Sequence, residues 1–531
     1  MDRRDFLATA LALSAGAFSG GRAFAASPAT APSPSSNSGG GSADLKFGEP
    51  KPFSYDALRA RARASAAKPY RSEPAPAAEL IKSISFDLNQ KIQFKPEYSL
   101  WPKGPGDFPV RFFHLNRYVE QPVRIHVVDG AASREILYSS SYFDYGGTGL
   151  DEKLPPDLGF AGFRMMNGPS EDADWLAFQG ASYFRSSGDE NQYGASARGI
   201  AIDTAMPRPE EFPRFTEFWL GEAQGSHAVT IYALLDGPSI TGAYRIDAER
   251  TKGAIMTMHV DLFARNPIER LGVAPLTSMF WYGENNSSRR KDWRPEIHDS
   301  DGLALWTGKG ERIWRPLNDP AQVQTNSFVD TNPKGFGLIQ RDRDFDNYQD
   351  DGAFYNRRPS IWVEPLGEWG EGAVQLVEIP TDDEIHDNIV AYWIPRAPVT
   401  RGKALTFDYR LYWGSGEPHP PSLGRVVATR IGRGGVPGQP PPKDQRKFVI
   451  DFQGGPLDDM AQRFDVKPVI NLSRGRVENP YVIKVVGTSR WRAFFDVELK
   501  GGEPLDMRCY LRLGKKTLTE TWLYQYFPPL A

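Results

Sequence analysis

Cysteine and histidine are scarce in this chain of 531 residues, which contains one cysteine, Cys509, and seven histidines. A single cysteine excludes an internal disulfide and a cysteine-built zinc site. The histidines are scattered, and the sequence has no His-Glu-x-x-His motif, no Gly-x-Ser-x-Gly elbow and no phosphate-binding glycine loop. Zinc proteases, serine hydrolases and P-loop enzymes of the familiar kinds are therefore excluded. No segment offers the ~20 uninterrupted apolar residues that a membrane-spanning helix needs.

A strong excess of one charge is also missing, since 63 Lys and Arg face 66 Asp and Glu, for a net charge of −3. This balance argues against a nucleic-acid binder, which needs a basic surface. Hydrophobic residues at 40% and charged residues at 24% are typical of a globular protein and exclude a wholly disordered chain. The 51 Gly and 44 Pro favour many short strands over long helices. Aromatic residues, at 12% with 13 Trp, suit stacking on the apolar faces of sugar rings.

The N-terminus has the pattern of a twin-arginine signal peptide over residues 1–25. Arg3 and Arg4 precede Phe-Leu, an apolar run over 8–18 and an Ala-x-Ala cleavage pattern ending at Ala25. The apolar run is too short to span the ~30 Å hydrocarbon core, which excludes a membrane anchor. We therefore predict export to the periplasm by the twin-arginine pathway. Residues 26–45, rich in Ser, Pro, Gly and Ala, are predicted to form a flexible linker.

Beyond the linker the dominant hydrophobic period is two, which predicts an all-β fold. Apolar residues alternate with polar ones over 123–127, 256–262, 407–413 and 507–513, so each run buries one face of a strand. Strands of this kind between Gly- and Pro-rich turns predict antiparallel sandwiches. The best helix candidate is 56–67, capped by Asp56 and packed on the outside of the main domain.

Two domains are predicted, with a boundary at the proline-broken segment 394–398, because proline can continue neither a ladder nor a helix interior. The large domain then covers 46–395 and the small one 396–531. The small domain, of about 130 residues, has the size of an immunoglobulin-like sandwich. Residues 432–447, with four prolines, are predicted to form a long exposed loop in it.

The candidate chemistry lies in three segments that combine acidic residues with aromatic, His or Arg residues, at 297–301, 350–359 and 384–388. Glycosidic bond cleavage needs two carboxylates, one protonated to donate to the leaving oxygen and one ionised to activate water. Taken alone, the same pattern also fits solvated surface turns. A fourth acidic run, Asp342, Asp344 and Asp346, resembles a calcium loop but lacks its glycine and its bidentate Glu, so an acidic turn is favoured and no metal is predicted.

Seven longer motifs resemble the periplasmic glucan biosynthesis proteins of the OpgG/OpgD (MdoG/MdoD) family. They are DLGFAGFR at 157–164, GASYFR at 180–185, QYGASARG at 192–199, IHDSD at 297–301, NPKGFG at 332–337, YNRRPS at 355–360 and ETWLYQYFPP at 520–529. The resemblance covers nearly the whole chain from about Phe53, and the twin-arginine start is similar to the OpgD branch. It implies a large galactose-mutarotase-like β-sandwich followed by a small immunoglobulin-like β-sandwich.

The same resemblance implies an inverting endo-β-1,2-glucanase or transglycosylase acting on linear β-1,2-glucan, without a cofactor. It matches the general acid to Asp387 and the general base to Asp299, which reaches the attacking water through a relay of waters and a sugar hydroxyl. Glu384 is expected to raise the pKa of the acid by like-charge repulsion, and Tyr355 to bind sugar or serve the relay. The expected substrate-binding set is Tyr355, Glu384, Asn356, Arg358 and Asp301.

The resemblance leaves two alternatives open. The protein is either an enzyme or a non-catalytic glucan-binding or scaffolding factor that assists a membrane synthase, and a homodimer is expected in both cases. In OpgD-like relatives the loop that corresponds to 432–447 is longer, carries aromatics and reaches the neighbouring subunit. Here it is shorter and rich in proline, which leaves open whether water or a sugar accepts the cut chain.

Several residues near these motifs have plainer interpretations. His298 and His386 are expected to be hydrogen-bonding neighbours of the matched aspartates rather than metal ligands. Trp362, Trp393 and Cys509 are expected in the core. Arg357 and Arg358 are interpreted equally well as sugar clamps or as partners of Asp350.

Overall fold

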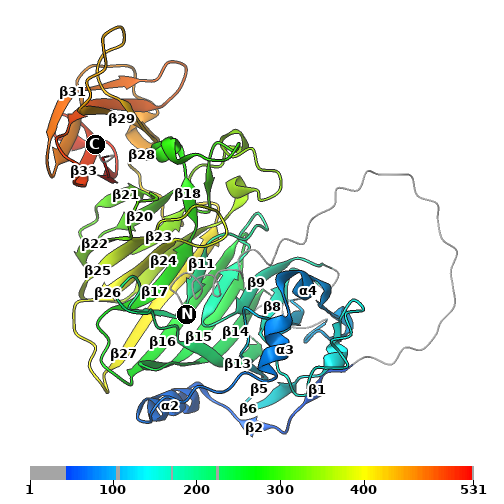
Figure 1. Ribbon diagram of the computed structural model, residues 1–531. Coiled ribbons are helices and arrows are strands. Elements are labelled where there is room, and N and C mark those ends of the chain that lie inside the picture. The colour runs from blue at the N-terminus through cyan, green and yellow to red at the C-terminus, as the bar shows by residue number, and fades with distance from the viewer. Residues whose placement is uncertain (1–43, 103–107, 169–170, 223–226, 529–531) are drawn as a thin grey trace, which may run out of the picture.

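The computed structural model describes residues 44–102, 108–168, 171–222 and 227–528 (Figure 1). The predicted signal peptide and most of the predicted linker lie outside the described residues. None of the helices in the described ranges has the length and apolar character needed to cross a membrane. The predicted all-β fold is confirmed: sheets dominate the structure and helices are few and short.

One long sheet forms the first layer of the large domain, and all but one of its internal pairings are antiparallel, the exception being β5 with β13. Short strands β1 (Lys46–Phe47) and β2 (Lys51–Pro52) pair with its edge strand. Its neighbouring strands are, in spatial order, β6 (Ala132–Leu137), β5 (Arg124–Asp129), β13 (Arg214–Glu222), β14 (Ala228–Asp236), β15 (Ile240–Arg250), β16 (Ala254–Ala264), β27 (Ala404–Gly414), β24 (Ser360–Leu366), β23 (Gly335–Ile339), β20 (Gly302–Trp306) and β21 (Arg312–Pro316).

A second sheet forms the facing layer. Its strands are, in order, β22 (Gln324–Thr331), β25 (Glu371–Glu378), β26 (Ile389–Pro395), β17 (Leu271–Ser278), β11 (Ser196–Arg198), β10 (Tyr183–Ser186), β9 (Asp174–Gln179), β8 (Gly162–Met166) and β4 (Val110–Phe113), with β12 (Ile200–Ile202) beside β17. Aromatic side chains join the two layers. The Phe163 ring lies 5.1 Å from that of Phe218, and the Phe184 ring lies 6.0 Å from that of Trp413.

The structure also has several short helices and strands. They are α3 (Ala78–Ser83), α4 (Phe86–Lys91), β3 (Gln93–Phe94), β7 (Phe143–Asp144), β18 (Phe280–Tyr282), β19 (Ile297–His298), β34 (Lys516–Thr517) and the 3₁₀ helices η2 (Pro96–Tyr98), η4 (Ser140–Tyr142), η5 (Glu284–Arg289), η6 (Phe345–Asn347), η7 (Tyr355–Arg357) and η8 (Gly455–Leu457).

The alternation in the sequence identified real strands. β16 and β27 pair with each other, with Met258 opposite Tyr409 and Val260 opposite Phe407. These four side chains are buried, as their spacing predicts. Cys509 is fully buried on β33 (Leu505–Leu513), which confirms its place in the core.

Helix α2 (Tyr55–Ala66) confirms the predicted helix, but its cap differs from the prediction. Ser54 is the N-cap, because its side chain accepts a hydrogen bond from the backbone of Ala57 at 3.2 Å. Asp56 lies in the first turn instead. The helix packs against the outer face of the first sheet through Leu58 and Ala62.

The domain boundary predicted at Pro395 is wrong by one strand. Proline ends β26, but the chain returns as β27, which pairs on one side with β16 and on the other with β24. The large domain therefore continues to Gly414, and we refer to residues 415–528 as the small domain. Figure 1 shows it in orange to red at one end of the sandwich, with α2 near the other end.

The small domain is a second, smaller sandwich. One sheet has the order β28 (Arg425–Arg433), β29 (Gln445–Gln453), β32 (Trp491–Glu498) and β31 (Arg476–Lys484), and the other contains β30 (Val466–Leu472), β33 and β35 (Thr521–Tyr526). β35 also pairs in parallel with β21, so the first sheet of the large domain continues into the small domain. β28 and β29 remain paired through Arg433 and Arg446, which shortens the predicted loop to residues 434–444.

Tryptophan rings lie directly over glycines in both sheets of the large domain. Trp362 and Trp393 are fully buried, as expected. A Cβ atom at Gly335 would lie 2.3 Å from the Trp362 ring, and one at Gly372 would lie 2.4 Å from the Trp393 ring. These glycines therefore leave the space that the rings occupy.

We expect Gly335→Ala to destabilise the protein, because the buried Trp362 ring has no room to move away from the added methyl group. Overpacking of this kind costs about 1–3 kcal/mol. The matched control is Gly432→Ala in β28, where a Cβ would meet nothing within 4 Å. Urea denaturation should show a lower midpoint for the first variant and little change for the second. Equal midpoints would contradict the packing argument.

Candidate active site

The candidate site lies near β18, at the end of the sandwich next to the small domain (Figure 1). It combines the β18–β19 hairpin and the residues that follow it with η7 and with the segment that precedes β26. Asn388 joins two of these parts: its Oδ1 accepts the backbone N–H of Phe280 at 2.8 Å, and its Nδ2 donates to the carbonyls of Phe280 and Ile379 at 2.9 and 2.8 Å. The segment that carries Asp387 is thereby fixed to the hairpin that carries Asp299.

Asp299 is buried and paired with Arg358. The residue is 2% exposed, its backbone N–H donates to the carbonyl of Met279 at 2.8 Å, and its Oδ1 accepts a hydrogen bond from the Arg358 guanidinium. Burial raises the pKa of Asp299 above its ordinary value, although the positive charge of Arg358 favours the carboxylate. The Arg358 guanidinium also lies 4.1 Å from the centre of the Tyr355 ring.

Asp387 is half-buried and has the environment of a proton donor. Desolvation by the surrounding protein raises the pKa of Asp387 to about 7, and the negative charge of Asp299 is the second largest cause. The Thr277 hydroxyl and the charges of Arg185 and Arg358 oppose that rise. The like-charge repulsion that we expected from Glu384 thus comes chiefly from Asp299.

Glu384 instead lies between a tyrosine and an arginine. Tyr355 donates its hydroxyl to Glu384 Oε2, and Arg294 donates to both carboxylate oxygens at 2.9 Å. Arg294 also bonds Asp350 at 2.6 Å. Asp350 therefore has Arg294 as its partner, whereas Arg358 pairs with Asp299. Burial, opposed by Arg358 and reinforced by Glu384, raises the pKa of the Tyr355 hydroxyl, which keeps it protonated as a donor.

The other two predicted sugar-binding residues lie beside this network. Both carboxylate oxygens of Asp301 accept backbone N–H groups, from Arg341 at 3.1 Å and Asp342 at 2.9 Å. Burial raises the pKa of Asp301 to about 6, and nearby positive charge and the backbone bonds oppose this. Asn356 has a buried Oδ1 for which the described part of the chain supplies no hydrogen-bond partner. A sugar contact by Asp301 or Asn356 stays a prediction.

The histidines next to the two aspartates differ from each other. His298 is fully buried and bonds Gln340 and Glu296, each at 3.0 Å. His386 is half-buried, and its Nδ1 has no hydrogen-bond partner in the ranges that the structure describes. The run from Asp342 to Asp346 forms a turn in which Asp342 and Asp344 accept backbone N–H groups. Within the same ranges no three His, Cys, Asp or Glu side chains are grouped to hold a metal ion.

Sequence reasoning gave no role to Arg185, Thr277 or Arg294. Arg185 lies on β10 beside buried Phe184, so the period of two places it on the outer face of that strand together with Tyr183. Thr277 is buried on β17, opposite Ser196, in a strand whose residues are all buried. Arg294 bonds a carboxylate 90 residues away along the chain, and no local pattern predicts that pairing.

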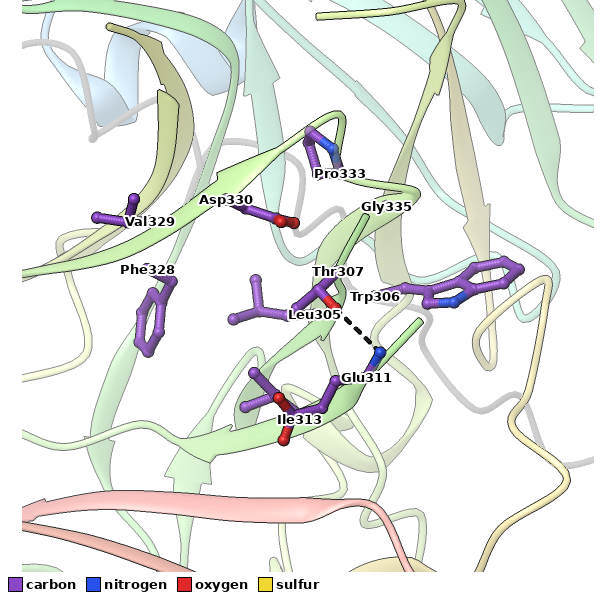
Figure 2. A pocket seen from close by; sticks show the side chains of 10 residues that line it. All are labelled: Leu305, Trp306, Thr307, Glu311, Ile313, Phe328, Val329, Asp330, Pro333 and Gly335. Atoms are coloured by element: carbon purple, nitrogen blue, oxygen red, sulfur yellow. Dashed lines mark hydrogen bonds between the residues drawn. The ribbon is translucent and has the colours of Figure 1, made fainter. Parts of the chain in front are cut away.

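A separate pocket of about 190 Å³ lies between β20, β21, β22 and β23 (Figure 2). It shares no lining residue with the Asp387–Asp299 site. Its carboxylates already have partners: Glu311 bonds Arg508 and Thr521 at 2.5 and 2.6 Å, and Asp330 accepts the backbone of Gly308 at 2.8 Å. We therefore place the candidate chemistry at Asp387 and Asp299.

The protein is an all-β sandwich protein, and its candidate site contains two electrostatically coupled aspartates. Comparison with known families identifies the family. Residues 53–526 match the family model described as "Periplasmic glucan biosynthesis protein, MdoG". The chain belongs to the periplasmic glucan biosynthesis protein family, and the resemblance seen in its motifs is confirmed.

Individual relatives agree with this assignment. The chain is 53% identical over 499 residues to "Glucans biosynthesis protein D 2" of Ralstonia nicotianae, covering 91% of this chain and 92% of that protein. It is 48% identical over 539 residues to "Glucans biosynthesis protein D" of Stenotrophomonas maltophilia (strain R551-3), covering 100% and 98%. It is 49% identical over 481 residues to "Probable glucans biosynthesis protein D" of Shewanella oneidensis, covering 90% and 89%. All three names belong to the D branch.

Proposed function

We propose that this protein is an enzyme that acts on linear β-1,2-glucan, by hydrolysis or by inverting transglycosylation, with Asp387 as general acid and Asp299 as general base. The β-1,2 linkage rests on the family resemblance. The observation that carries the catalytic assignment is the raised pKa of Asp387, about 7, beside an aspartate paired with arginine. Glycosidic bond cleavage needs one protonated and one ionised carboxyl group, and we assign the ionised role to Asp299 because Arg358 favours its carboxylate.

The proposed step begins when Asp387 gives its proton to the glycosidic oxygen and the bond from that oxygen to the anomeric carbon breaks. A water molecule, or a hydroxyl of another sugar, attacks the anomeric carbon from the opposite face and gives its proton to Asp299. Because Asp299 is 2% exposed and bonded to Arg358, this proton travels through an intervening hydroxyl or water. We assign to Tyr355, which donates its hydroxyl to Glu384, the role of orienting the sugar.

We further propose that the protein works in the periplasm after twin-arginine export, with a glucan chain as its substrate, a second copy of itself as a partner and a functional link to a membrane glucan synthase. A binding role without catalysis is the second candidate function. It is favoured by the burial of Asp299 and its bond to Arg358, which leave this carboxylate without direct access to water.

Incubation of the purified mature protein with linear β-1,2-glucan, followed by product analysis, separates the two functions. Shorter chains indicate hydrolysis, and cyclic or rearranged chains indicate transfer. Binding of glucan without any new product over a long incubation would support the scaffolding role and contradict the enzyme.

The rate of cleavage should fall as pH rises through about 7. The general acid acts only when protonated, and the pKa of Asp387 is raised to about 7, so the rate drops about tenfold per pH unit above that value. Below the pKa of Asp299 the base is protonated, which gives the acid side of a bell-shaped profile. Initial rates from about pH 4 to about pH 9 test this. A profile that stays flat through neutral pH would contradict the assignment of Asp387.

A further inference from the structure

His298 on β19 is enclosed by protein on every side. The residue is 0% exposed, its ring stacks on Phe280 with the ring centres 5.3 Å apart, and the Tyr348 ring meets it in a T-shaped contact with the centres 5.2 Å apart. Both ring nitrogens have hydrogen-bond partners: Nδ1 lies 3.0 Å from Gln340 Oε1, and Nε2 lies 3.0 Å from Glu296 Oε2. The identities of those two partner atoms decide where the ring carries its protons.

The orientation of the Gln340 amide is fixed by atoms other than His298. The two hydrogens of its Nε2 have three acceptors within reach, namely the backbone carbonyls of His298 and Tyr355, each at 3.1 Å, and the Tyr348 hydroxyl at 2.9 Å. Carbonyl oxygens only accept hydrogen bonds, so the NH₂ group must point to them. The Oε1 atom is therefore the end that faces His298, and the Nδ1 of His298 must carry a proton.

The second nitrogen faces Glu296. An ionised carboxylate only accepts hydrogen bonds, so Nε2 donates to it and the ring carries a proton on each nitrogen. Burial disfavours a charged ring, but the hydrogen bond and charge of Glu296, followed by the charges of Asp301 and Asp342, outweigh this and raise the pKa of His298 above its ordinary value. The charged groups that face the ring are Glu296, Asp299, Asp301 and Asp342.

We infer that Glu296 and Gln340 hold His298 as a buried imidazolium, which serves as a positioning residue for the candidate base Asp299. The inference deepens the proposed function and rests on it for the role of Asp299. Two effects follow from the charged ring. It favours the ionised form of the neighbouring Asp299 and Asp301. It also accepts no proton at Nδ1, so it stays bonded to Gln340, whose amide joins β19 to η7, which carries Tyr355.

The charge of His298 can be read directly by NMR of the mature chain labelled with ¹⁵N-histidine, with His298→Gln to identify its signals. Both ring nitrogens of His298 should show imidazolium shifts and keep them well above pH ~6.5, the ordinary histidine midpoint. A neutral tautomer at neutral pH, as would occur if Glu296 held the proton, would overturn the inference. This measurement does not depend on whether the protein cleaves glucan.

Glu296→Gln tests the role of the charge, because it removes the counter-charge and keeps a side chain of the same shape. It should lower the titration midpoint of His298 by roughly 1–3 pH units. The titration midpoint of the Asp299 carboxyl should rise, as measured by NMR in protein labelled with ¹³C at the aspartate carboxyl groups. The Asp299→Asn variant identifies its signal. The acid side of the pH profile of cleavage should also move to higher pH. The exposed Glu79→Gln is the matched control and should change none of these values. An unmoved Asp299 midpoint in Glu296→Gln would overturn the positioning role, and absence of cleavage in the unaltered protein would refute only the proposed function.

Discussion

Asp387→Asn should reduce cleavage of linear β-1,2-glucan by about 10²–10⁴-fold, the usual contribution of a general acid. Asparagine has nearly the shape of aspartate but no proton that it can transfer to the glycosidic oxygen. The half-buried position and the nearby Thr277 hydroxyl accept an amide without leaving a charge unpaired. Binding of glucan and the urea midpoint should therefore change little, which separates a chemical loss from a folding loss.

Asp382→Asn is the matched control for this experiment. It lies in the same segment, its side chain is 86% exposed and its partner is the surface residue Lys291, so it should keep full activity. If Asp387→Asn retained the rate of the unaltered protein, another group would have to be the acid. Asp299→Asn is a less direct test, because it leaves the Arg358 guanidinium buried without its counter-charge and costs stability as well as activity.

The strands were predictable from the sequence because burial of one face of a strand leaves a period of two. Their partners were not. The alternation at 407–413 identified β27, yet its neighbours β16 and β24 come from distant parts of the chain. A proline ends a strand locally but does not say whether the next strand joins the same sheet, and the boundary placed at Pro395 failed for this reason. The prediction of the N-cap of α2 was wrong because serine and aspartate, present here as Ser54 and Asp56, are both good capping residues.

Only those residues of the candidate site that lie in recognisable family motifs could be predicted from the sequence. Acidic residues beside aromatics fit surface turns as well as an active site, and the family resemblance singled out Asp387 and Asp299. Their environments depend on Arg358, Thr277 and Asn388, which are far apart in the sequence. The charge of His298 depends on the orientation of an amide 42 residues away. Such pairings follow from the folded arrangement of the chain and leave no local signal.

Arg341→Met should produce the largest loss of stability that we predict. The Arg341 guanidinium is buried where the two domains meet. It bonds Glu520 at 2.5 Å and Glu417 at 2.7 Å, donates to the carbonyl of Val426 at 3.1 Å and lies 3.7 Å from the centre of the Trp314 ring. Its partners Glu417 and Glu520 are themselves buried, at 3% and 2% exposure. Arg341 thus pairs with two buried carboxylates, and Arg312 lies 3.8 Å from Glu417 as a second cation.

Removal of one member of a buried ion pair costs about 3–5 kcal/mol, because the charge that remains is uncompensated. Methionine fills much of the same space, so the loss measured by urea denaturation reports the charge rather than a cavity. Arg396→Met, in an exposed pair with Glu371, should cost at most about 1 kcal/mol. The triple variant Arg341→Met, Glu417→Gln, Glu520→Gln should recover part of the loss. An unchanged midpoint for Arg341→Met alone would show that water or another cation reaches the two glutamates.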